Sequence, residues 1–332
     1  MPPDADTTCR RTLHSMFHSE DLAIEVEALT KRYGQVQAVD GVSFTVKPGE
    51  VFAFVGPNGA GKSTTVEIIE TIRLPTSGRV RVLGMDVTQH KRKIIPRIGV
   101  LPQGFASFDR ITVRESIQYY AGLFGCKHAD IDGLIKLANL GDKANAQFQT
   151  LSGGLKQRLG IAIALVNDPE VVFLDEPTTG LDPHARRAVW EVLLGLKRQG
   201  KAVFLTTHYM EEAELLADTV AVISKGKIVA IGSPSELIER NANYMRLTLK
   251  STDARMLHAL QRLHYEPDGD SLSSITIRIK ETEEVYAILS ALKTAGLPLP
   301  GVDIRKPNLE DTFLRITEDR LEDGARTNGR GP

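Results

Sequence analysis

The stretch GPNGAGKST, residues 56–64, limits what this chain can fold into more than any other part of its sequence. It matches G-x-x-x-x-G-K-[ST] at every fixed position and lies between the apolar run VFAFV and the helical pattern KSTTVEIIETI. Its glycines let backbone N–H groups approach an anion, and the helix N-terminus adds partial positive charge. We therefore expect a phosphate-binding loop, in which Lys62 reaches the β- and γ-phosphates of a nucleotide and Ser63 binds Mg²⁺. The expected nucleotide contacts are Gly56, Pro57, Asn58, Gly59, Ala60, Gly61, Lys62, Ser63 and Thr64.

A pair of carboxylates follows a second apolar run, VVFLDEP, at residues 171–177. The run is typical of a strand buried on both faces, so Asp175 lies at its carboxyl end, where open parallel sheets bind ligands. A phosphate-binding loop needs a carboxylate for its Mg²⁺ from a neighbouring strand, and Asp175 can supply it. Glu176 is then placed to polarise an attacking water. Outside such a setting, an Asp-Glu pair is most often a solvated turn.

Two further polar features lie at the ends of expected elements. The strand KAVFLTTH ends at His208; a lone histidine is usually structural, but a neutral imidazole at this edge can sense the γ-phosphate. In LSGGLKQ, residues 151–157, Ser152, Gly153 and Gly154 open a helical pattern and form a second arrangement suited to an anion. The residues alone do not say why one chain needs two such sites.

Apolar strands alternate with helical patterns from Leu22 to about residue 240, which predicts an α/β fold with a largely parallel core sheet. After residue 240 the pattern becomes strand, helix, strand, helix, strand. We expect residues 243–316 to form a small α+β domain without a catalytic motif. Residues 1–21 and 317–332 are predicted to be disordered tails.

Composition argues against several classes of protein. The formal net charge of −1 gives no global basic field of the kind that nucleic-acid binding uses. The cysteines, Cys9 and Cys126, have no metal-like spacing and indicate a reducing compartment. No apolar run reaches the ~18 residues that a membrane-spanning helix needs. The first 21 residues lack the apolar core of a secretory signal.

In this order, the pieces resemble the ATP-binding subunit of an ABC transporter over residues 22–240. GPNGAGKST resembles the Walker A motif, VVFLDE the Walker B motif, and LSGGLKQ the ABC signature. Gln103 in VLPQG resembles the Q-loop glutamine, and Asp182 in GLD resembles the D-loop aspartate. His208 in TTH resembles the switch histidine, and Tyr33 in KRYG the aromatic that stacks on adenine. Without the resemblance, Tyr33 would be interpreted as a surface tyrosine on a strand.

The resemblance implies an ABC-type P-loop NTPase fold, with a parallel core sheet, flanking helices, and antiparallel β and helical subdomains. It also implies that two ATPase domains pair head to tail. The P-loop of one chain and Ser152, Gly153 and Gly154 of the other then hold each ATP. Because this chain carries one of each, a homodimer with two composite sites is expected.

The implied chemistry is ATP hydrolysis with ATP and Mg²⁺ as cofactors. Mg²⁺ is expected on Ser63, Gln103 and Asp175. The catalytic residues implied by the resemblance are Lys62, Glu176 and His208, of which Glu176 acts on water and His208 positions the γ-phosphate.

In this family the transported compound passes through a separate integral membrane permease. The resemblance therefore places the chain at the cytoplasmic face of the cell membrane as a peripheral subunit. PNLEDTFLRITED, residues 307–319, resembles the tail of ATPases that serve drug and antibiotic exporters of the daunorubicin-resistance type. Its simpler interpretation is an amphipathic helix with Leu309, Phe313 and Ile316 packing on the core. We expect a subunit that powers export of a drug, antibiotic or other hydrophobic compound.

Three alternatives remain beside export. An importer ATPase is one, although sugar-type importers carry a longer all-β extension. A non-transport ABC ATPase acting on nucleic acid or ribosomes is another, against which stand the single ATPase domain and the net charge of −1. The third is a scaffold that does not hydrolyse ATP, and the retained Lys62, Asp175, Glu176 and His208 argue against it.

Leu155 departs from the family's signature, which commonly has glutamine at this position. The groups expected to touch phosphate are the Ser152 hydroxyl and the glycine amides, which leucine leaves unchanged. We expect Leu155 to tune packing near the partner chain, because leucine keeps good helix propensity.

Overall fold

The computed structural model describes residues 22–241, 244–250, 253–267 and 274–316. They divide into two compact units. The first contains the chain up to His208 together with Leu216–Ile228, and the second contains Tyr209–Leu215 and the chain from Val229 onward. The predicted tails lie outside the described residues, and the domain boundary expected at 240–243 stays a prediction.

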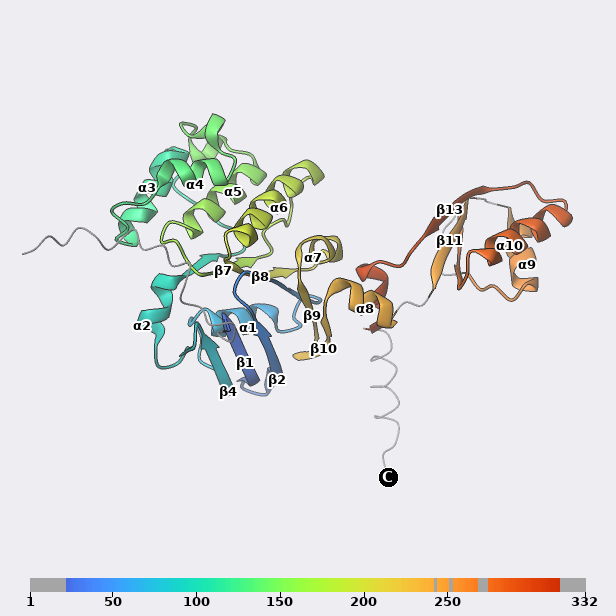
Figure 1. Cartoon of the computed structure of the whole chain (residues 1–332), viewed down its shortest axis with the longest axis horizontal. Helices are drawn as coiled ribbons and strands as arrows, with labels where there is room; N and C mark the ends of the chain where they lie inside the picture. The colour runs from blue at the N-terminus through green and yellow to red at the C-terminus, as the bar shows by residue number, and fades with distance from the viewer. Residues whose placement is uncertain (1–21, 242–243, 251–252, 268–273, 317–332) are drawn as a thin grey trace, which may run out of the picture. The chain divides into compact units, whose positions relative to one another are not determined.

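A mainly parallel sheet forms the centre of the first unit, with the strand order β10-β9-β3-β8-β7-β6. Figure 1 labels four of these strands, β7, β8, β9 and β10. The strands are β3 (Val51–Val55), β6 (Ile98–Leu101), β7 (Val171–Asp175), β8 (Ala202–Thr207), β9 (Thr219–Ser224) and β10 (Lys227–Gly232), the last of which contains a boundary between the units. β9–β3, β3–β8, β8–β7 and β7–β6 pair in parallel, which confirms the predicted core. β3 and β8 are buried along their whole length, as strands of a sheet covered on both faces are.

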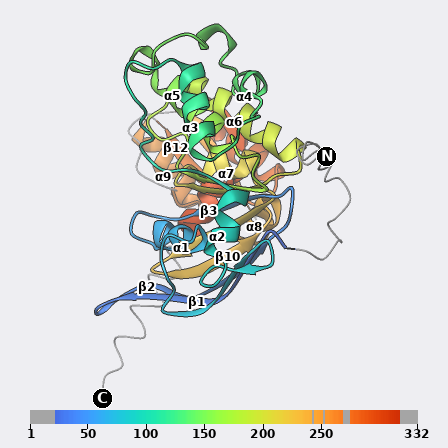
Figure 2. The same cartoon turned by 90° about the vertical axis from the view of Figure 1, so that its left-hand side faces the viewer.

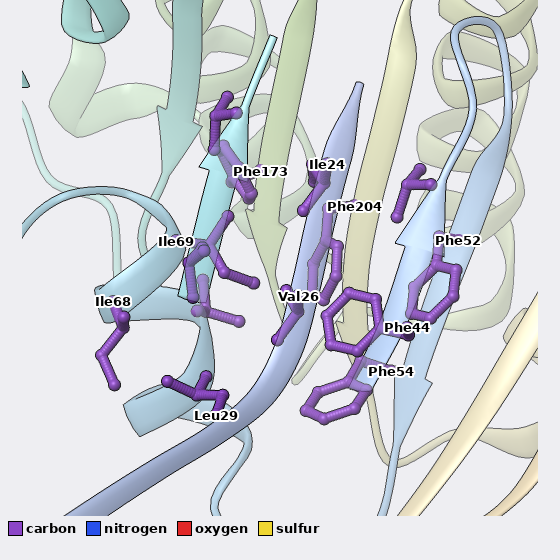
Figure 3. Close-up of a cluster of buried hydrophobic side chains, with 14 of the residues drawn as sticks. Ile24, Val26, Leu29, Phe44, Phe52, Phe54, Ile68, Ile69, Phe173 and Phe204 are labelled. Carbon is purple, nitrogen blue, oxygen red and sulfur yellow. The ribbon is translucent and has the colours of Figure 1, made fainter. Parts of the chain in front are cut away.

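A second, antiparallel sheet has the order β2-β1-β4-β5. Its strands are β1 (Ile24–Tyr33), β2 (Val36–Val46), β4 (Ser77–Val82) and β5 (Met85–Asp86). One hydrophobic cluster joins this sheet, α1 (Lys62–Ile69) and the parallel sheet. Figure 3 shows Phe44 of β2 beside Phe52 and Phe54 of β3 and Phe204 of β8; the Phe44 and Phe52 rings stack at 4.9 Å. This packing fixes β3, the strand that leads into the phosphate loop.

Helices gather at the other end of the first unit, as both views show for α3, α4, α5 and α6 (Figures 1 and 2). Besides α1, the helices of this unit are α2 (Lys91–Ile94), α3 (Val113–Leu123), α4 (Ile131–Leu137), α5 (Gly153–Ala164) and α6 (Pro183–Arg198), with 3-10 turns at Ile95–Arg97, Gly141–Lys143 and Phe148–Thr150. α3 begins with a capping box between Thr112 and Glu115. Residues 113–137 contain two helices, because the chain turns after Leu123 and Asp130 caps a new start.

The second unit follows the predicted order of strand, helix, strand, helix, strand. It contains β11 (Met245–Lys250), α9 (Ala254–Arg262), β12 (Ile275–Ile279), α10 (Glu283–Thr294) and β13 (Gly301–Arg305), together with α8 (Pro234–Asn241) and nearly all of α7 (Met210–Leu216). Its antiparallel sheet has the order β12-β11-β13. Leu247 and Leu249 of β11 and Ile277 of β12 are fully buried in a cluster that includes residues of α9 and α10. No helix among the described segments is both long and apolar enough to cross a bilayer.

A last helix, residues 309–316, ties parts of the second unit together. Asn308 and Asp311 cap its start reciprocally, since each accepts a hydrogen bond from the other's backbone N–H. The Leu309 N–H donates to Glu214 Oε2 in α7 at 2.8 Å. Leu309 and Ile316 are buried and Phe313 is half-buried, in agreement with the amphipathic helix that the tail sequence suggests.

Asp311 is also the buried partner of two sheet arginines. Its carboxylate accepts a hydrogen bond from Arg246 of β11 and lies 3.6 Å from the guanidinium of Arg305 in β13. The Asp311 side chain is 3% exposed and that of Arg246 17%. A charge this well buried depends on its partner, because removing one member of such a pair leaves the other desolvated.

Asp311→Ala should therefore destabilise the second unit by about 3 kcal/mol, the lower part of the range for breaking a buried ion pair. Urea unfolding followed by intrinsic fluorescence, with limited proteolysis to identify the unit that opens, measures the change. The matched control is Glu310→Ala, an exposed neighbour on the same helix, for which we expect less than about 0.5 kcal/mol. Equal effects of the two substitutions would contradict a stabilising role for the Asp311 pair.

Candidate active site

Four segments leave the parallel sheet at one edge. β3 leads into the phosphate loop, while β6, β7 and β8 end within two residues of Gln103, Glu176 and His208. The parallel register of β7 on β8 places Asp175 opposite Thr206, so the carboxyl ends of these strands are level. The structure thus brings together polar residues that are separated by up to about 150 positions along the chain, at the edge where parallel sheets bind ligands.

The glycines of the phosphate loop are required by close backbone contacts. A Cβ at Gly56 would overlap the carbonyl oxygen of Ile223, and a Cβ at Gly61 would lie 2.5 Å from that of Ala38. Gly61 also has a φ of 104° and occupies the N-cap of α1. The loop is therefore held against two neighbouring segments, with the first N–H groups of α1 available to an anion.

Lys62, the first residue of α1, turns back over this loop. Its Nζ donates to the carbonyl oxygen of Gly56 at 2.6 Å and to that of Pro57 at 3.2 Å. The side chain is buried, and burial lowers the pKa of its ammonium, while the nearby Glu176 and Asp175 raise it. An ammonium held over the loop's amides is suited to phosphate oxygens.

Glu176 is the centre of the site. Its Oε2 accepts hydrogen bonds from Gln103 Nε2 and Thr179 Oγ1, each at 3.1 Å, and lies 3.3 Å from His208 Nδ1. The carboxylate is 11% exposed, and the residue has a φ of 48°, a conformation that non-glycine residues rarely adopt. Three segments therefore hold one carboxylate oxygen in place on a strained backbone.

Thr206 connects the two strand ends, and sequence reasoning did not single it out. Its hydroxyl donates to Asp175 Oδ1, while the Glu176 N–H points at the carbonyl and hydroxyl oxygens of Thr206, both at 3.1 Å. Thr206 is fully buried. Thr179, which holds Glu176, was also missed. Both contacts depend on strand register and turn shape, for which the sequence carries no local signal.

The residues expected to hold Mg²⁺ offer a hydroxyl, an amide oxygen and a carboxylate, all hard oxygen ligands of the kind that Mg²⁺ prefers. Asp175 is half-buried, and Ser63 and Gln103 are exposed. The described residues contain no group of three or more His, Cys, Asp or Glu side chains arranged around a metal. A single carboxylate fits a Mg²⁺ that is bound chiefly through nucleotide phosphates.

The signature residues lie apart from this centre. Ser152 caps α5 and accepts a hydrogen bond from Leu155 N–H at 3.4 Å. Gly154 allows α5 to approach α6 closely, since a Cβ there would lie 2.7 Å from that of Ala185. Leu155 packs against the helical cluster of its own chain. Within the described segments, no hydrogen bond links residues 152–154 to the phosphate loop or to Glu176.

Two other expected site residues have local partners. Asp182 caps α6 by accepting from Ala185 N–H at 2.9 Å, and this bond lowers the pKa of its carboxyl. Tyr33, at the end of β1 and 39% exposed, has Lys31 Nζ 5.1 Å and Arg73 Cζ 5.7 Å from its ring centre. A nucleotide base can stack on the face of such an aromatic ring, and the neighbouring cations can contact the phosphate groups of the same nucleotide.

Known proteins resemble this chain over the residues that form the site and over most of its length. Residues 39–179 match the family model described as ABC transporter. The Nod factor export ATP-binding protein I of Rhizobium meliloti is 41% identical over 307 residues, covering 91% of this chain and 90% of that protein. The protein of the same name from Ralstonia nicotianae is 39% identical over 307 residues, covering 90% and 95%. This chain belongs to the ABC transporter family.

Solved structures agree with this ABC ATPase assignment. CbiO1 from Clostridium perfringens, part of an ABC transporter complex, is 29% identical with a TM-score of 0.60, covering 66% of this chain and 92% of that one. A dimeric ATP-binding cassette bound to ADP and Pi is 26% identical with a TM-score of 0.56, covering 63% and 98%. The predicted fold class and ATPase activity are thereby confirmed.

One electrostatic feature of this ABC ATPase was not anticipated from its sequence. Glu70, directly after α1, is 7% exposed. Burial, with the negative charges of Asp175 and Glu67, raises the pKa of its carboxyl to about 8. Near neutral pH, Glu70 is therefore protonated and adds no further negative charge beside Asp175.

This raised pKa predicts a pH-dependent stability. The folded ABC ATPase keeps a proton on Glu70 that the unfolded chain releases near the ordinary value of 4.5, so folding loses stability as pH rises from 4.5 to about 8. Glu70→Gln cannot ionise, and its stability relative to the original chain should increase by a few kcal/mol across this window, then level off. Urea unfolding at several pH values measures this change, with Glu27→Gln, an exposed glutamate on β1, as the control. A difference that is constant with pH would contradict the assignment.

Proposed function

We propose that this ABC ATPase powers an exporter and that its catalytic centre is the Glu176 carboxylate. The observation that carries the proposal is the convergence of Gln103, Thr179 and His208 on Glu176 Oε2, at the sheet edge that also holds the phosphate loop. Three contacts from separate segments keep the carboxylate in one orientation. A fixed general base needs no reorganisation when water attacks.

The phosphate end of the site is proposed to work through positive charge. Lys62 exchanges its contacts with the loop carbonyls for the β- and γ-phosphate oxygens, and the backbone N–H groups of residues 58–64 hold the same phosphates. Ser63, Gln103 and Asp175 hold Mg²⁺, which when bound neutralises charge on the phosphates. Thr206 positions Asp175 for this role through its hydroxyl.

Water is proposed to be activated at Glu176. The carboxylate orients the water and accepts its proton as the oxygen attacks the γ-phosphate. His208 contacts Glu176 through Nδ1 and keeps Nε2 for the γ-phosphate. Gln103 contacts the same carboxylate, so a change at the γ-phosphate can reach the helical region that follows this glutamine.

Two chains are proposed to form two composite ATP sites as a homodimer. Ser152 caps α5 and Gly153 and Gly154 begin it, which suits an anion, yet among the described residues no hydrogen bond links these three to the centre. A similar cassette bound to ADP and Pi is dimeric. In this arrangement, Asp182 lies at the interface, and Tyr33 stacks on the adenine of the ATP held by its own chain.

Export is proposed from the relatives. Both named relatives are export ATP-binding proteins and match the chain over about nine-tenths of its length, including the second unit. We infer a separate integral membrane permease, a peripheral position at the cytoplasmic face of the membrane, and no nucleic-acid partner, in keeping with the net charge of −1. We assign ATP hydrolysis to residues 22–240 and treat residues 243–316 as an accessory domain.

Glu176→Gln tests the centre and the composite site together. The amide keeps the size of the side chain but cannot take a proton, so we expect turnover to fall at least about 100-fold, the usual size of a general-base effect. With ATP and Mg²⁺ the variant should run as a dimer in size-exclusion chromatography, because hydrolysis no longer releases the nucleotide.

Adding Ser152→Arg to this variant supplies the matched control. We expect ATP binding by the P-loop to persist while the ATP-dependent dimer is lost, because only the site facing the partner's nucleotide is blocked. Loss of nucleotide binding by the monomer would refute the role of Ser152 in the partner's site. A monomeric Glu176→Gln protein with bound ATP would count against the whole arrangement.

Export predicts a membrane partner. Affinity-tagged protein, expressed with the coding sequences that flank its own, should purify from detergent-solubilised membranes with one polytopic protein in an equimolar ratio. The permease should stimulate ATP turnover several-fold when the two are reconstituted. Copurification of ribosomes or DNA in its place, sensitive to nuclease, would overturn the transport function.

A further inference from the structure

Among the described residues, the second unit presents an open sheet edge. The order β12-β11-β13 leaves β13 as an outer strand, and all five of its residues are exposed. The opposite edge is partly occupied, because Pro267 forms a bridge with Ile277 of β12. Outer strands expose N–H and C=O groups that can pair with another chain unless some feature prevents it. β13 itself contains no proline and is paired along its whole length with β11.

Apolar residues of β13 remain half exposed on one face. Val302 and Ile304 lie opposite Leu249 and Leu247, and therefore on the same face as that buried pair. The β11 leucines are fully buried, whereas Val302 is 41% and Ile304 42% exposed. The hydrophobic cluster that buries the side chains of β11 and β12 thus does not include the apolar side chains of β13.

The other face of β13 carries one charge of each sign. Asp303 and Arg305 are two residues apart and point to the same face. Arg305 lies 3.6 Å from Asp311, and Asp303 forms no ion pair with another described residue. An acidic and a basic residue at this spacing are self-complementary when the strand runs antiparallel to a copy of itself.

We propose that β13 pairs antiparallel with β13 of a second copy of this chain, with the two-fold axis at Ile304. In this register Ile304 faces its equivalent, and Asp303 of each copy faces the partner's Arg305. Val302 then faces the partner's Lys306, and Pro307 ends the pairing because it has no N–H. The two sheets join into one continuous antiparallel sheet.

Charge selects this register from its neighbours. Paired residues share a face, so the symmetric alternatives move the axis by one residue. An axis at Asp303 sets two carboxylates opposite each other, which is destabilising. An axis at Val302 leaves Asp303 opposite Gly301 and brings Pro300 into the ladder. The axis at Ile304 alone yields two opposite-charge pairs around an apolar centre.

This interface needs no nucleotide, which separates it from the proposed ATP-dependent dimer. It is small, so it forms a reversible dimer whose population rises with protein concentration. Within a complex that already holds two ATPase subunits, the tethered edges meet at high effective concentration. The accessory domain then keeps two subunits together while ATP leaves the composite sites.

The test uses the full chain without nucleotide or Mg²⁺. Sedimentation velocity over a range of concentrations should show a shift from 36.4 kDa toward twice that mass. Asp303→Arg and Arg305→Asp should each remain monomeric, because like charges then face each other. An equimolar mixture of the two variants should regain the doubled mass, since every pair across the interface is again of opposite sign. Arg262→Glu on α9 is the matched control and should dimerise normally.

Cysteine cross-linking tests the register. In a background with Cys9→Ser and Cys126→Ser, Ile304→Cys should form a disulfide dimer, because opposed Cα atoms in antiparallel strands lie ~4.5–5.5 Å apart. Val302→Cys, whose equivalents are far apart in this register, should not. A disulfide through position 302 and none through 304 would overturn the proposal.

The remaining outcomes distinguish this inference from the proposed function. A chain that stays monomeric at every concentration without nucleotide, with no rescue in the mixture, refutes β13 pairing. Combining Glu176→Gln with Arg305→Asp should still give a dimer with ATP, because the composite sites do not involve β13. Failure of that ATP-dependent dimer, with nucleotide-free dimerisation of the original chain intact, would refute the proposed function and leave β13 pairing standing.

Discussion

The parallel pairing of β7 with β8 is the contact on which the proposed active site depends. It sets Asp175 opposite Thr206, whose hydroxyl and carbonyl then hold the Asp175 carboxylate and the Glu176 N–H. A shift of one residue would turn every side chain of one strand to the other face. The buried apolar side chains of these strands fix the register, so the packing of the core determines where the carboxylates of Asp175 and Glu176 lie.

The negative charge of the site is limited in two ways: Lys62 lies near the carboxylates, and burial keeps Glu70 protonated. Lys62 is the buried cation near Asp175 and Glu176, and both carboxylates favour its charged form against burial. Glu70 would add a third negative charge, but its raised pKa keeps it neutral. Mg²⁺ that arrives with the nucleotide would offset the charge of the two site carboxylates.

Sequence patterns predicted the residues that directly follow an apolar strand, because the carboxyl ends of parallel strands form the edge at which such sheets bind ligands. The phosphate loop, Asp175, Glu176 and His208 were found in this way. Thr206 and Thr179 were not, because their contacts depend on strand register and on the left-handed turn at Glu176. The partner site of Ser152 came from family resemblance, because spacing within one chain says nothing about a second chain.

The order in which the chain visits its two units has a practical consequence. It crosses between them three times, after His208, Leu215 and Ile228. Residues 209–215, which form nearly all of α7, therefore belong to the second unit although they lie in the sequence between β8 and β9 of the first. Glu214 of α7 accepts a hydrogen bond from the N–H of Leu309, near the carboxyl end of the described residues. The accessory portion is therefore interleaved rather than appended. A stop codon placed after β10 would strip α7 of this partner, and a chimera between relatives must exchange residues 209–215 together with 229–316.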